Sequence, residues 1–478
     1  MGNDLRKNYI YNVSIQIVSL LTPLITAPYL SRILGEEGVG TFSYVHSIAT
    51  YFALLAALGM SSYGLREVSR VRDNRVQTSR LFWELSVIRI VNTLLSFLLY
   101  VVFIWGTGSD WRVYLATGFT ILAVGVDCTW FFQAMENFKS LMVRNLMIKL
   151  VSVVLIFALV HDAGDVPLYC AIQTGSIFLS NLVMWPQLKK MVRPMRLRRL
   201  KFTRHIREAL VYFVPTIATS VYTVLDKTMI GAITHSMAQN GYYESAHKIV
   251  NILLTVITSL NVVVGVRTSY LFGQHKDEEV RDHIRNTSRF MYMISFPMCA
   301  GLVACGYSFA LEFYGGNFAE AGVMLMMFSP LLFTIGTSNV LGSLYLTPSG
   351  QRARSNRAII AGAATNLVLN LVLIPRLGAY GAVVASVLAE VVISGLYLWF
   401  SHSFVSAWQL LGMAARYAGF SFIMFIPIYW MGRVMPVEAF TILSQIAVGA
   451  ILYALLLILF RDPAWQTCKE ILRKKLKK

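Results

Sequence analysis

The chain has 478 residues, of which 56% are hydrophobic and 14% are charged, and its mean hydropathy is +0.59. So apolar a composition excludes an ordinary soluble domain and is typical of a chain that crosses a membrane repeatedly. In a soluble protein the net charge of +18 would suggest a nucleic-acid partner. Here we assign it to loops that face anionic lipid head groups, and we expect no nucleic-acid binding.

Long apolar segments follow one another along the whole sequence. A helix needs about 20 apolar residues to cross a hydrocarbon core roughly 30 Å thick. Fourteen segments are predicted to span: 9–34, 40–65, 81–105, 112–136, 141–160, 167–188, 208–234, 242–272, 287–310, 320–346, 358–376, 380–400, 413–433 and 439–460. We therefore expect an all-α integral membrane protein with about 14 transmembrane helices.

The basic residues between these segments fall almost entirely on one side. With the N-terminus inside, 32 of the 42 Lys and Arg lie on the inner side. Four lie on the outer side, namely Arg32, Arg112, Arg376 and Arg433. The other six fall within the spans: Arg89, Lys149, Lys227, Lys248, Arg267 and Arg416. This positive-inside bias predicts a multi-pass protein of the cell (inner or plasma) membrane with both termini in the cytoplasm.

A basic connection at 189–207 divides the spans. It holds nine Lys and Arg and is the longest inner connection. The sequence therefore predicts an N-terminal six-helix bundle at 1–188, a basic cytoplasmic linker at 189–207 and a C-terminal six-helix bundle at 208–400. Helices 13 and 14 follow at 401–460, and a basic amphipathic cytoplasmic tail at 461–478 has the pattern of an interfacial helix.

Cysteine usage and the first apolar run point to no further processing. The five cysteines show no paired spacing, which argues against a disulfide framework and a zinc site. The first apolar run is too long for the core of a signal peptide, so we expect it to be retained as the first helix. No metal and no cofactor are expected.

Ionisable residues inside the spans need an explanation because a charge in hydrocarbon costs several kcal/mol. At 1.5 Å per residue, Arg89, Asp127 and Lys149 are predicted to lie deep in the first half of the chain. Asp226, Lys227, Lys248 and Glu390 lie at comparable depth in the second half. The cations would suit an anionic head group that passes through a cavity, because Arg and Lys both bind phosphate.

Local pairing is the alternative explanation for these charges. Arg89 with Asp127, and Lys248 with Glu244 four residues earlier, could be ion pairs that only hold helices together. Glu84 lies close enough to the membrane edge to need no function. His247, beside a charged pair, is more often a hydrogen-bonded structural group than a proton carrier.

The sequence lacks the motifs of the common catalytic classes. It has no G-x-x-x-x-G-K-[ST], H-E-x-x-H or G-x-S-x-G, so we expect no ATP hydrolysis by the usual phosphate-binding loop and no enzyme activity. Energy would then come from an ion gradient, with H+ or Na+ as the coupling ion. A buried carboxylate such as Asp127, Asp226 or Glu390 could carry the proton, and spacing does not say which.

Several motifs resemble those of the Wzx-type oligosaccharide flippases, which share a superfamily with the lipid II flippases and the MATE drug exporters. These motifs are Pro28-Tyr29-Leu30-Ser31-Arg32, Tyr63-Gly64-Leu65-Arg66-Glu67, Asp127 with Trp130-Phe131-Phe132-Gln133 and Glu136, Leu225-Asp226-Lys227 with Gly231, and Asn370 with Ile374-Pro375, Gly381-Ala382 and Glu390. The resemblance covers spans 1–12, and Ala134 stands where the family usually has Gly.

The resemblance implies a MATE-like fold of two six-helix bundles about a cavity, with alternating access by rocking of the bundles. The cargo would be a polyprenyl-diphosphate-linked oligosaccharide, moved to the outer leaflet for O-antigen, capsule or exopolysaccharide synthesis. Spans 13 and 14 would guide its lipid tail, and a polysaccharide polymerase with chain-length machinery would be partners. The residues expected to line the cavity are Arg32, Arg89, Asp127, Lys149, Asp226, Lys227, Lys248 and Glu390.

Three other functions remain open at this point. A lipid II flippase differs mainly in cargo. A MATE-like, cation-coupled exporter of small molecules predicts an acidic or aromatic cavity, which the basic excess disfavours. A membrane glycosyltransferase or polymerase predicts a long outer loop, whereas the outer connections are only about five to seven residues long.

Overall fold

The computed structural model describes residues 2–107, 110–195, 202–467 and 469. Side chains at 2–21, 107, 203, 211, 214–223, 260, 262–263 and 266 lie outside that description. The described residues are helical or in turns and contain no β-strand. The chain divides into two compact units, Met1–Gly241 and Tyr242–Lys478, and each is treated by itself.

The first unit contains ten α-helices among its described residues. They are α1 (Gly2–Ala57), α2 (Met60–Val71), α3 (Arg75–Thr107), α4 (Trp111–Thr117), α5 (Phe119–Val126), α6 (Thr129–Ala134), α7 (Phe138–Leu159), α8 (Val166–Val183), α9 (Trp185–Met191) and α10 (Thr203–Thr234). Helix α1 is broken at Gly35, whose φ of 65° and ψ of −177° are non-helical. Only glycine adopts this conformation at little cost, and the break separates the predicted spans 9–34 and 40–65.

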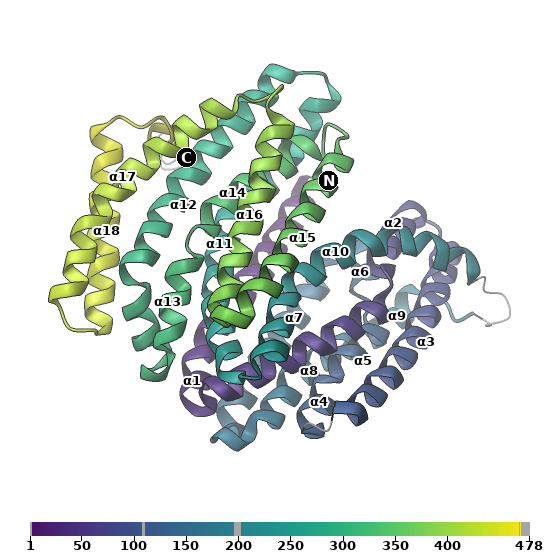
Figure 1. The fold of residues 1–478 in the computed structure, drawn as a ribbon. Helices are drawn as coiled ribbons and strands as arrows, with labels where there is room; N and C mark the ends of the chain where they lie inside the picture. Colours follow the sequence, from purple (N-terminus) through teal and green to yellow (C-terminus); the bar gives the residue numbers. More distant parts are fainter. Residues whose placement is uncertain (1, 108–109, 196–201, 468, 470–478) are drawn as a thin grey trace. The chain divides into compact units, whose positions relative to one another are not determined.

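The described residues of this unit include two apolar clusters. One joins the second half of α1 to α3, α4, α7 and α8 through residues such as Ala49, Tyr100 and Ile156. The other gathers aromatic rings of α3 and α6, including Phe82 and Trp130. In Figure 1, α1, α3, α5 and α8 lie side by side, in agreement with their contacts.

A close helix approach in the first unit depends on two glycines. A Cβ atom added to Gly40 would lie 1.7 Å from the carbonyl oxygen of Met237. One added to Gly241 would lie 2.0 Å from the carbonyl oxygen of Glu36. Any side chain at either position would force the two backbones apart, so this crossing requires glycine on both helices.

The second unit contains the remaining helices. They are α11 (Met237–Gly273, which begins within the first unit), α12 (Asp277–Tyr314), α13 (Ala319–Phe328), α14 (Leu331–Leu341), α15 (Arg352–Leu377), α16 (Ala379–Ser401), α17 (Ala407–Val434) and α18 (Ala439–Leu459). Helix α15 packs along α16, α17 packs on α12, and α18 packs on α17 (Figure 1). The predicted span 320–346 bends by 43° between Phe328 and Leu331, next to Pro330, which lacks a backbone N–H.

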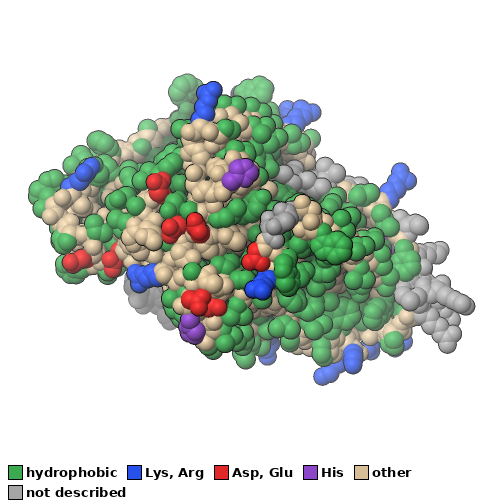
Figure 2. All heavy atoms as spheres, turned by 60° about the horizontal axis from the view of Figure 1, so that its bottom comes forward, with side chains coloured by type: hydrophobic (Ala, Val, Ile, Leu, Met, Phe, Trp, Pro, Cys, Tyr) green, Lys and Arg blue, Asp and Glu red, His purple; other side chains and the backbone are tan. Residues whose placement is uncertain are grey.

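Ten described helices are long and apolar enough to cross a membrane, or eleven when the bent segment is counted. Large apolar side chains such as Leu98, Val154, Phe422 and Leu443 are more than half exposed, as suits a lipid-facing surface. Figure 2 shows one face on which hydrophobic side chains predominate and charged ones are scattered. The chain is a multi-pass membrane protein, and the predicted count of fourteen is compatible with these helices.

Two predicted boundaries fall partly outside the described residues. The predicted linker 189–207 begins within α9 and ends within α10, and its residues 196–201 are not described. Most of the predicted interfacial tail, residue 468 and residues 470–478, is likewise outside the description. The compact division puts α10 with the first unit, and the grouping into two six-helix bundles stays a prediction.

Candidate functional site

A helix break carries the aspartate of the most specific sequence motif. Helix α5 ends at Val126, and Asp127 has extended backbone angles, with φ −69° and ψ 118°. Its Oδ1 accepts a hydrogen bond of 2.9 Å from the backbone N–H of Thr129, where α6 begins. The Trp130 indole donates to the Asp127 carbonyl oxygen at 3.1 Å. Asp127 and Trp130 therefore satisfy backbone groups that the broken span leaves without helical partners.

Arg89 of α3 lies against this break and is 2% exposed. Its Nη2 donates to Asp127 Oδ2 and to the Val124 carbonyl oxygen, both at 3.0 Å. Its Nη1 donates to Ser61 at 3.2 Å. The structure thus brings Arg89 and Asp127 together as an ion pair, the local alternative that the sequence left open for them.

A second buried arginine reaches the same break, and sequence reasoning missed it. Arg144 of α7 is 9% exposed and donates to Thr129 at 3.2 Å and to Asn181 at 3.5 Å. The Asn181 amide in turn donates to the Ala123 carbonyl oxygen at 3.0 Å. From the sequence, Arg144 is one of the cations assigned to the inner side. Arg144 is the fourth residue of the predicted span 141–160, and this position could have indicated a cation inside the membrane.

Arg89, Asp127 and Arg144 form what we call the charged cluster of the first unit. It contains two guanidinium groups and one carboxylate, and Arg144 is within electrostatic reach of Asp127. If all three are ionised, the cluster carries one net positive charge. Such a charge is expensive in a low-dielectric interior and is typical of a functional position in membrane proteins.

Lys149 lies five residues beyond Arg144 on the same helix and is half-buried. Its ammonium makes no hydrogen bond or ion pair with the residues that the structure describes; only its carbonyl oxygen is used, by Ser152. Among the predicted cavity residues, Lys149 is thus a cation without a described local partner.

Asp226 and Lys227 are on α10, which packs against α1. Asp226 is 5% exposed, and Lys227 is half-buried. Next to them, Thr228 is 2.8 Å from the Ser47 hydroxyl and donates to Tyr51 at 3.2 Å. The Lys227 carbonyl oxygen accepts a 2.7 Å bond from the fully buried Asn240. This packing holds one face of α10 in a fixed register against α1.

A buried histidine and glutamate form a second polar group that the sequence did not predict. His205 Nε2 is 2.8 Å from Glu84 Oε2, and His205 Nδ1 is 2.9 Å from the Tyr63 hydroxyl. Arg80 donates to Glu84 Oε1 at 2.9 Å. Glu84 lies near the end of a predicted span, where a charge needs no function, and His205 lies in the predicted linker. Their separation of 121 positions gave no sequence signal.

In the second unit, Lys248 and Glu244 lie on one face of α11. Their charged atoms are 3.9 Å apart, and both side chains are partly exposed. His247 stacks on Tyr243 with 5.6 Å between ring centroids, and Asn251 Nδ2 is 3.1 Å from its Nδ1. This local pairing is the alternative that the sequence left open for Lys248.

Glu390 of α16 is 8% exposed, and in the sequence of α16 it lies near Ser386, which belongs to a group of buried polar residues of α15 and α16. Asn370 donates to Asn366 at 3.1 Å, and Asn366 donates to Ser386 at 3.4 Å. Both asparagines are fully buried. Polar side chains that bond across two helices stabilise their packing in a membrane, and Glu390 lies one helical turn beyond Ser386 on α16.

The remaining predicted features give no further site. Arg32 of α1 is exposed. No group of His, Cys, Asp or Glu among the described residues has the arrangement of a metal site. The four described cysteines, Cys128, Cys170, Cys299 and Cys305, are free thiols. Arg89 and Asp127 are two predicted residues that the structure joins by a close ion pair.

Comparison with known proteins places this chain in a family. The model of the polysaccharide biosynthesis protein family matches residues 5–265. A candidate O-antigen transporter of Escherichia coli (strain K12) is 22% identical over 414 residues, which cover 83% of this chain and 96% of that protein. A lipid II flippase structure in an inward closed conformation aligns with a TM-score of 0.70 and 15% identity, covering 95% of this chain and 99% of that one.

An inward-facing multidrug resistance MATE family transporter aligns less well. Its TM-score is 0.57 at 11% identity, and the alignment covers 83% of this chain and 98% of that one. At such identities the structural likenesses establish the fold, which is MATE-like, and leave the cargo open. The family match spans more than half of the sequence, and the chain belongs to the polysaccharide biosynthesis protein family.

Proposed function

We propose that this protein is a flippase that moves polyprenyl-diphosphate-linked oligosaccharide repeat units from the cytoplasmic to the outer leaflet for surface polysaccharide biosynthesis. The family match and a relative named for O-antigen transport support this cargo class. The MATE-like fold, shared with a lipid II flippase, supports transport by alternating access. The protein acts as a transporter and not as an enzyme.

The observation that carries this proposal is positive charge held inside membrane-spanning helices. The charged cluster contains Arg89 and Arg144 against one carboxylate, and Lys149 has no described partner. A diphosphate needs cationic contacts wherever it leaves water, and Arg and Lys supply them as a fork and as a point charge. A cavity for cationic drugs would need the opposite charge.

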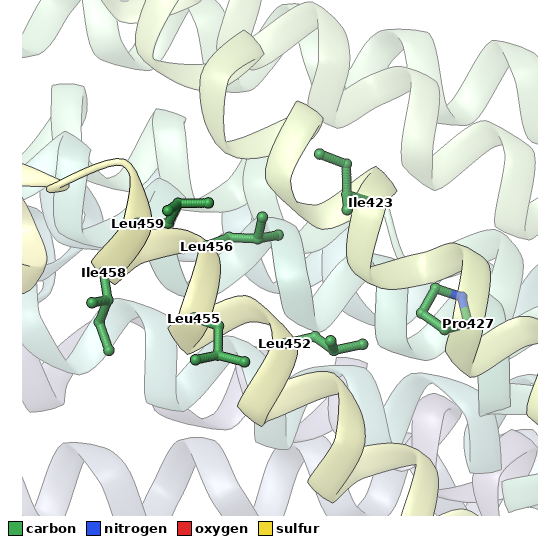
Figure 3. Close-up of a pocket in the computed structure, with 7 residues that line it drawn as sticks. All are labelled: Ile423, Pro427, Leu452, Leu455, Leu456, Ile458 and Leu459. Carbon is green, nitrogen blue, oxygen red and sulfur yellow. The ribbon is translucent and has the colours of Figure 1, made fainter.

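An apolar groove on the last two helices suits the lipid tail. It has a volume of about 440 Å³ and lies between α17 and α18. Figure 3 shows Ile423 and Pro427 on α17 and four leucines of α18 along it. A polyprenyl chain gains little by leaving lipid for such a surface, so we assign the groove to guiding the tail and not to tight binding.

The transport cycle needs a source of energy. We assign coupling to H+ or Na+ and favour Asp226 or Glu390 as the carrying carboxylate, since each is buried within a helix. Asp127 is a weaker candidate because Arg89 stabilises its ionised form. A polysaccharide polymerase with its chain-length machinery would take up the flipped product in the outer leaflet.

Lys149→Gln tests the cationic path. We expect this variant to be made and folded normally but to flip lipid-linked oligosaccharide at least several-fold more slowly, because one charge that faces the diphosphate is lost. The assay is restoration of surface polysaccharide in cells that lack their own flippase. Lys190→Gln, which removes an exposed charge, is the control. Equal polysaccharide from both variants would refute the cationic path.

The membrane orientation is tested by cysteine labelling in a background with Cys468→Ser. We expect His235→Cys, at an exposed position, to react with a membrane-impermeant maleimide added outside cells. Lys190→Cys should react only after permeabilisation. Asn240 is unsuitable because it is fully buried. The opposite labelling pattern would overturn the assignment of both termini to the cytoplasm.

A further inference from the structure

A small polar recess in the first unit shares Tyr63 with the buried Glu84–His205 pair, because Tyr63 lines the recess and its hydroxyl contacts His205. It has a volume of about 160 Å³ and opens between α2 and the start of α10. Three arginines line it: Arg66, Arg70 and Arg204. Pockets for drug-sized molecules span roughly 300–1,000 Å³, so this recess suits one small charged group and not a sugar chain.

The charges of the recess are only partly neutralised. Arg70 pairs with Glu67 at 2.9 Å, and Arg66 donates to the neutral Tyr212 hydroxyl. Glu208 also lines the recess. Arg204 makes no hydrogen bond or ion pair with the described residues. With three guanidinium groups against two carboxylates, the recess keeps a positive balance that favours an anion.

Tyr63 connects the recess to the buried His205. Tyr63 lines the recess, and its hydroxyl is 2.9 Å from His205 Nδ1. Arg80 pairs with Glu84 at 2.9 Å, which favours the ionised carboxylate. An ionised carboxylate only accepts hydrogen bonds, so His205 Nε2, at 2.8 Å from it, must be the donor.

The direction of the Tyr63 O–H bond therefore depends on the charge of His205. In the neutral ring, Nε2 carries the proton, so Nδ1 accepts a hydrogen bond from Tyr63. When His205 takes up a second proton, Nδ1–H donates to the Tyr63 oxygen. The hydroxyl hydrogen is then free to turn into the recess, where it can bind an anion.

We propose that this recess is a binding site for a phosphate group whose occupation is coupled to proton uptake by His205. Arg204 and Arg66 hold the anion. The Tyr63 hydroxyl donates a hydrogen bond to the anion once the His205 ring is protonated at Nδ1. One proton enters from solvent for each anion bound and forms an N–H bond at Nδ1, and no bond between heavy atoms forms or breaks. The charged and titratable groups around the Tyr63–His205 hydrogen bond come from three helices. They are Arg66, Glu67 and Arg70 of α2, Arg80 and Glu84 of α3, and Arg204, Glu208 and Tyr212 of α10.

The inference rests on the proposed function only for its ligand source, a diphosphate lipid at the membrane surface. The site itself is tested without transport. Sulfate is a suitable probe because it resembles phosphate and does not titrate near neutral pH. We would titrate it into the full-length protein in lipid nanodiscs by calorimetry, in two buffers with different ionisation enthalpies, between pH 6.5 and 8.

For the unmodified protein we expect sulfate binding with net proton uptake and an affinity that falls with rising pH. Arg204→Gln should weaken binding at least fivefold. Tyr63→Phe should bind sulfate without proton uptake and with an affinity that does not change with pH, since the hydroxyl that couples the two sites is gone. Lys190→Gln, outside the recess, should change neither quantity.

Three results would overturn the proposal: unchanged sulfate affinity in Arg204→Gln, no proton uptake by the unmodified protein, or undiminished uptake in Tyr63→Phe. Replacing sulfate by inorganic diphosphate and by farnesyl diphosphate identifies the source. Tighter binding of the prenylated compound supports a lipid-linked ligand, and equal binding supports the phosphate group alone. If sulfate does not bind while polysaccharide export persists, this site is refuted and the flippase function stands.

Discussion

The ion pair between Arg89 and Asp127 permits a quantitative test of what holds the broken span in place. Arg89 is 2% exposed, and its Nη2 is 3.0 Å from Asp127 Oδ2. At an effective dielectric constant of about 20, two unit charges at 3.0 Å attract each other by roughly 5 kcal/mol. Removing one partner of a buried pair typically costs about 3–5 kcal/mol, because the other charge stays buried without compensation.

We therefore expect Asp127→Asn to lower the free energy of unfolding by about 3–5 kcal/mol. The asparagine oxygen can still accept from the Thr129 N–H, which Asp127 holds at 2.9 Å. Its NH2 group then faces the Arg89 guanidinium, so Arg89 loses both the opposite charge and its acceptor. The double variant Arg89→Met/Asp127→Asn removes both charges and should lie within about 2 kcal/mol of the unmodified protein. Unfolding in mixed micelles with increasing sodium dodecyl sulfate measures these differences.

The unmodified protein, Asp127→Asn and the double variant also distinguish a structural role of Arg89 from a role in transport. A double variant that is stable and still exports polysaccharide would assign Arg89 to helix packing alone. One that is stable but inactive would place Arg89 on the path of the head group. The reasoning about the pair is refuted if Asp127→Asn costs less than about 1 kcal/mol, or if the double variant is less stable than Asp127→Asn.

Two further predictions follow from helix contacts. Gly40→Ala should lower thermal stability strongly, by about 3 kcal/mol or more, because the new methyl group would lie 1.7 Å from the Met237 carbonyl oxygen. Gly175→Ala, where nothing lies within 4 Å, should be neutral or slightly stabilising. Equal melting temperatures for Gly40→Ala and Gly175→Ala would contradict the close approach of Gly40 to Met237. Leu455→Trp should fill the groove between α17 and α18 and slow export several-fold at normal expression, whereas Leu443→Trp, exposed on α18 outside the groove, should not. Equal export by both tryptophan variants would show that the groove does not guide the lipid tail.

The sequence alone determined the class of this protein, because apolar length and the distribution of basic residues are properties of local composition. A bilayer requires every spanning backbone to satisfy its own hydrogen bonds, so runs of apolar residues predict helices without knowledge of their neighbours. Asp127 and Trp130 could likewise be singled out, since their motif is contiguous. Only the structure shows that their side chains form hydrogen bonds with backbone groups at the helix break.

Only the tertiary structure decided which buried charges meet. The partners Arg144 and Asn181 are 37 positions apart, and Glu84 and His205 are 121 positions apart. No local periodicity relates residues on different helices, because helix rotation and packing set which side chains face each other. The sequence could place a charge at a depth in the membrane, but the direction of its side chain and the partner that stabilises it depend on how the helices pack.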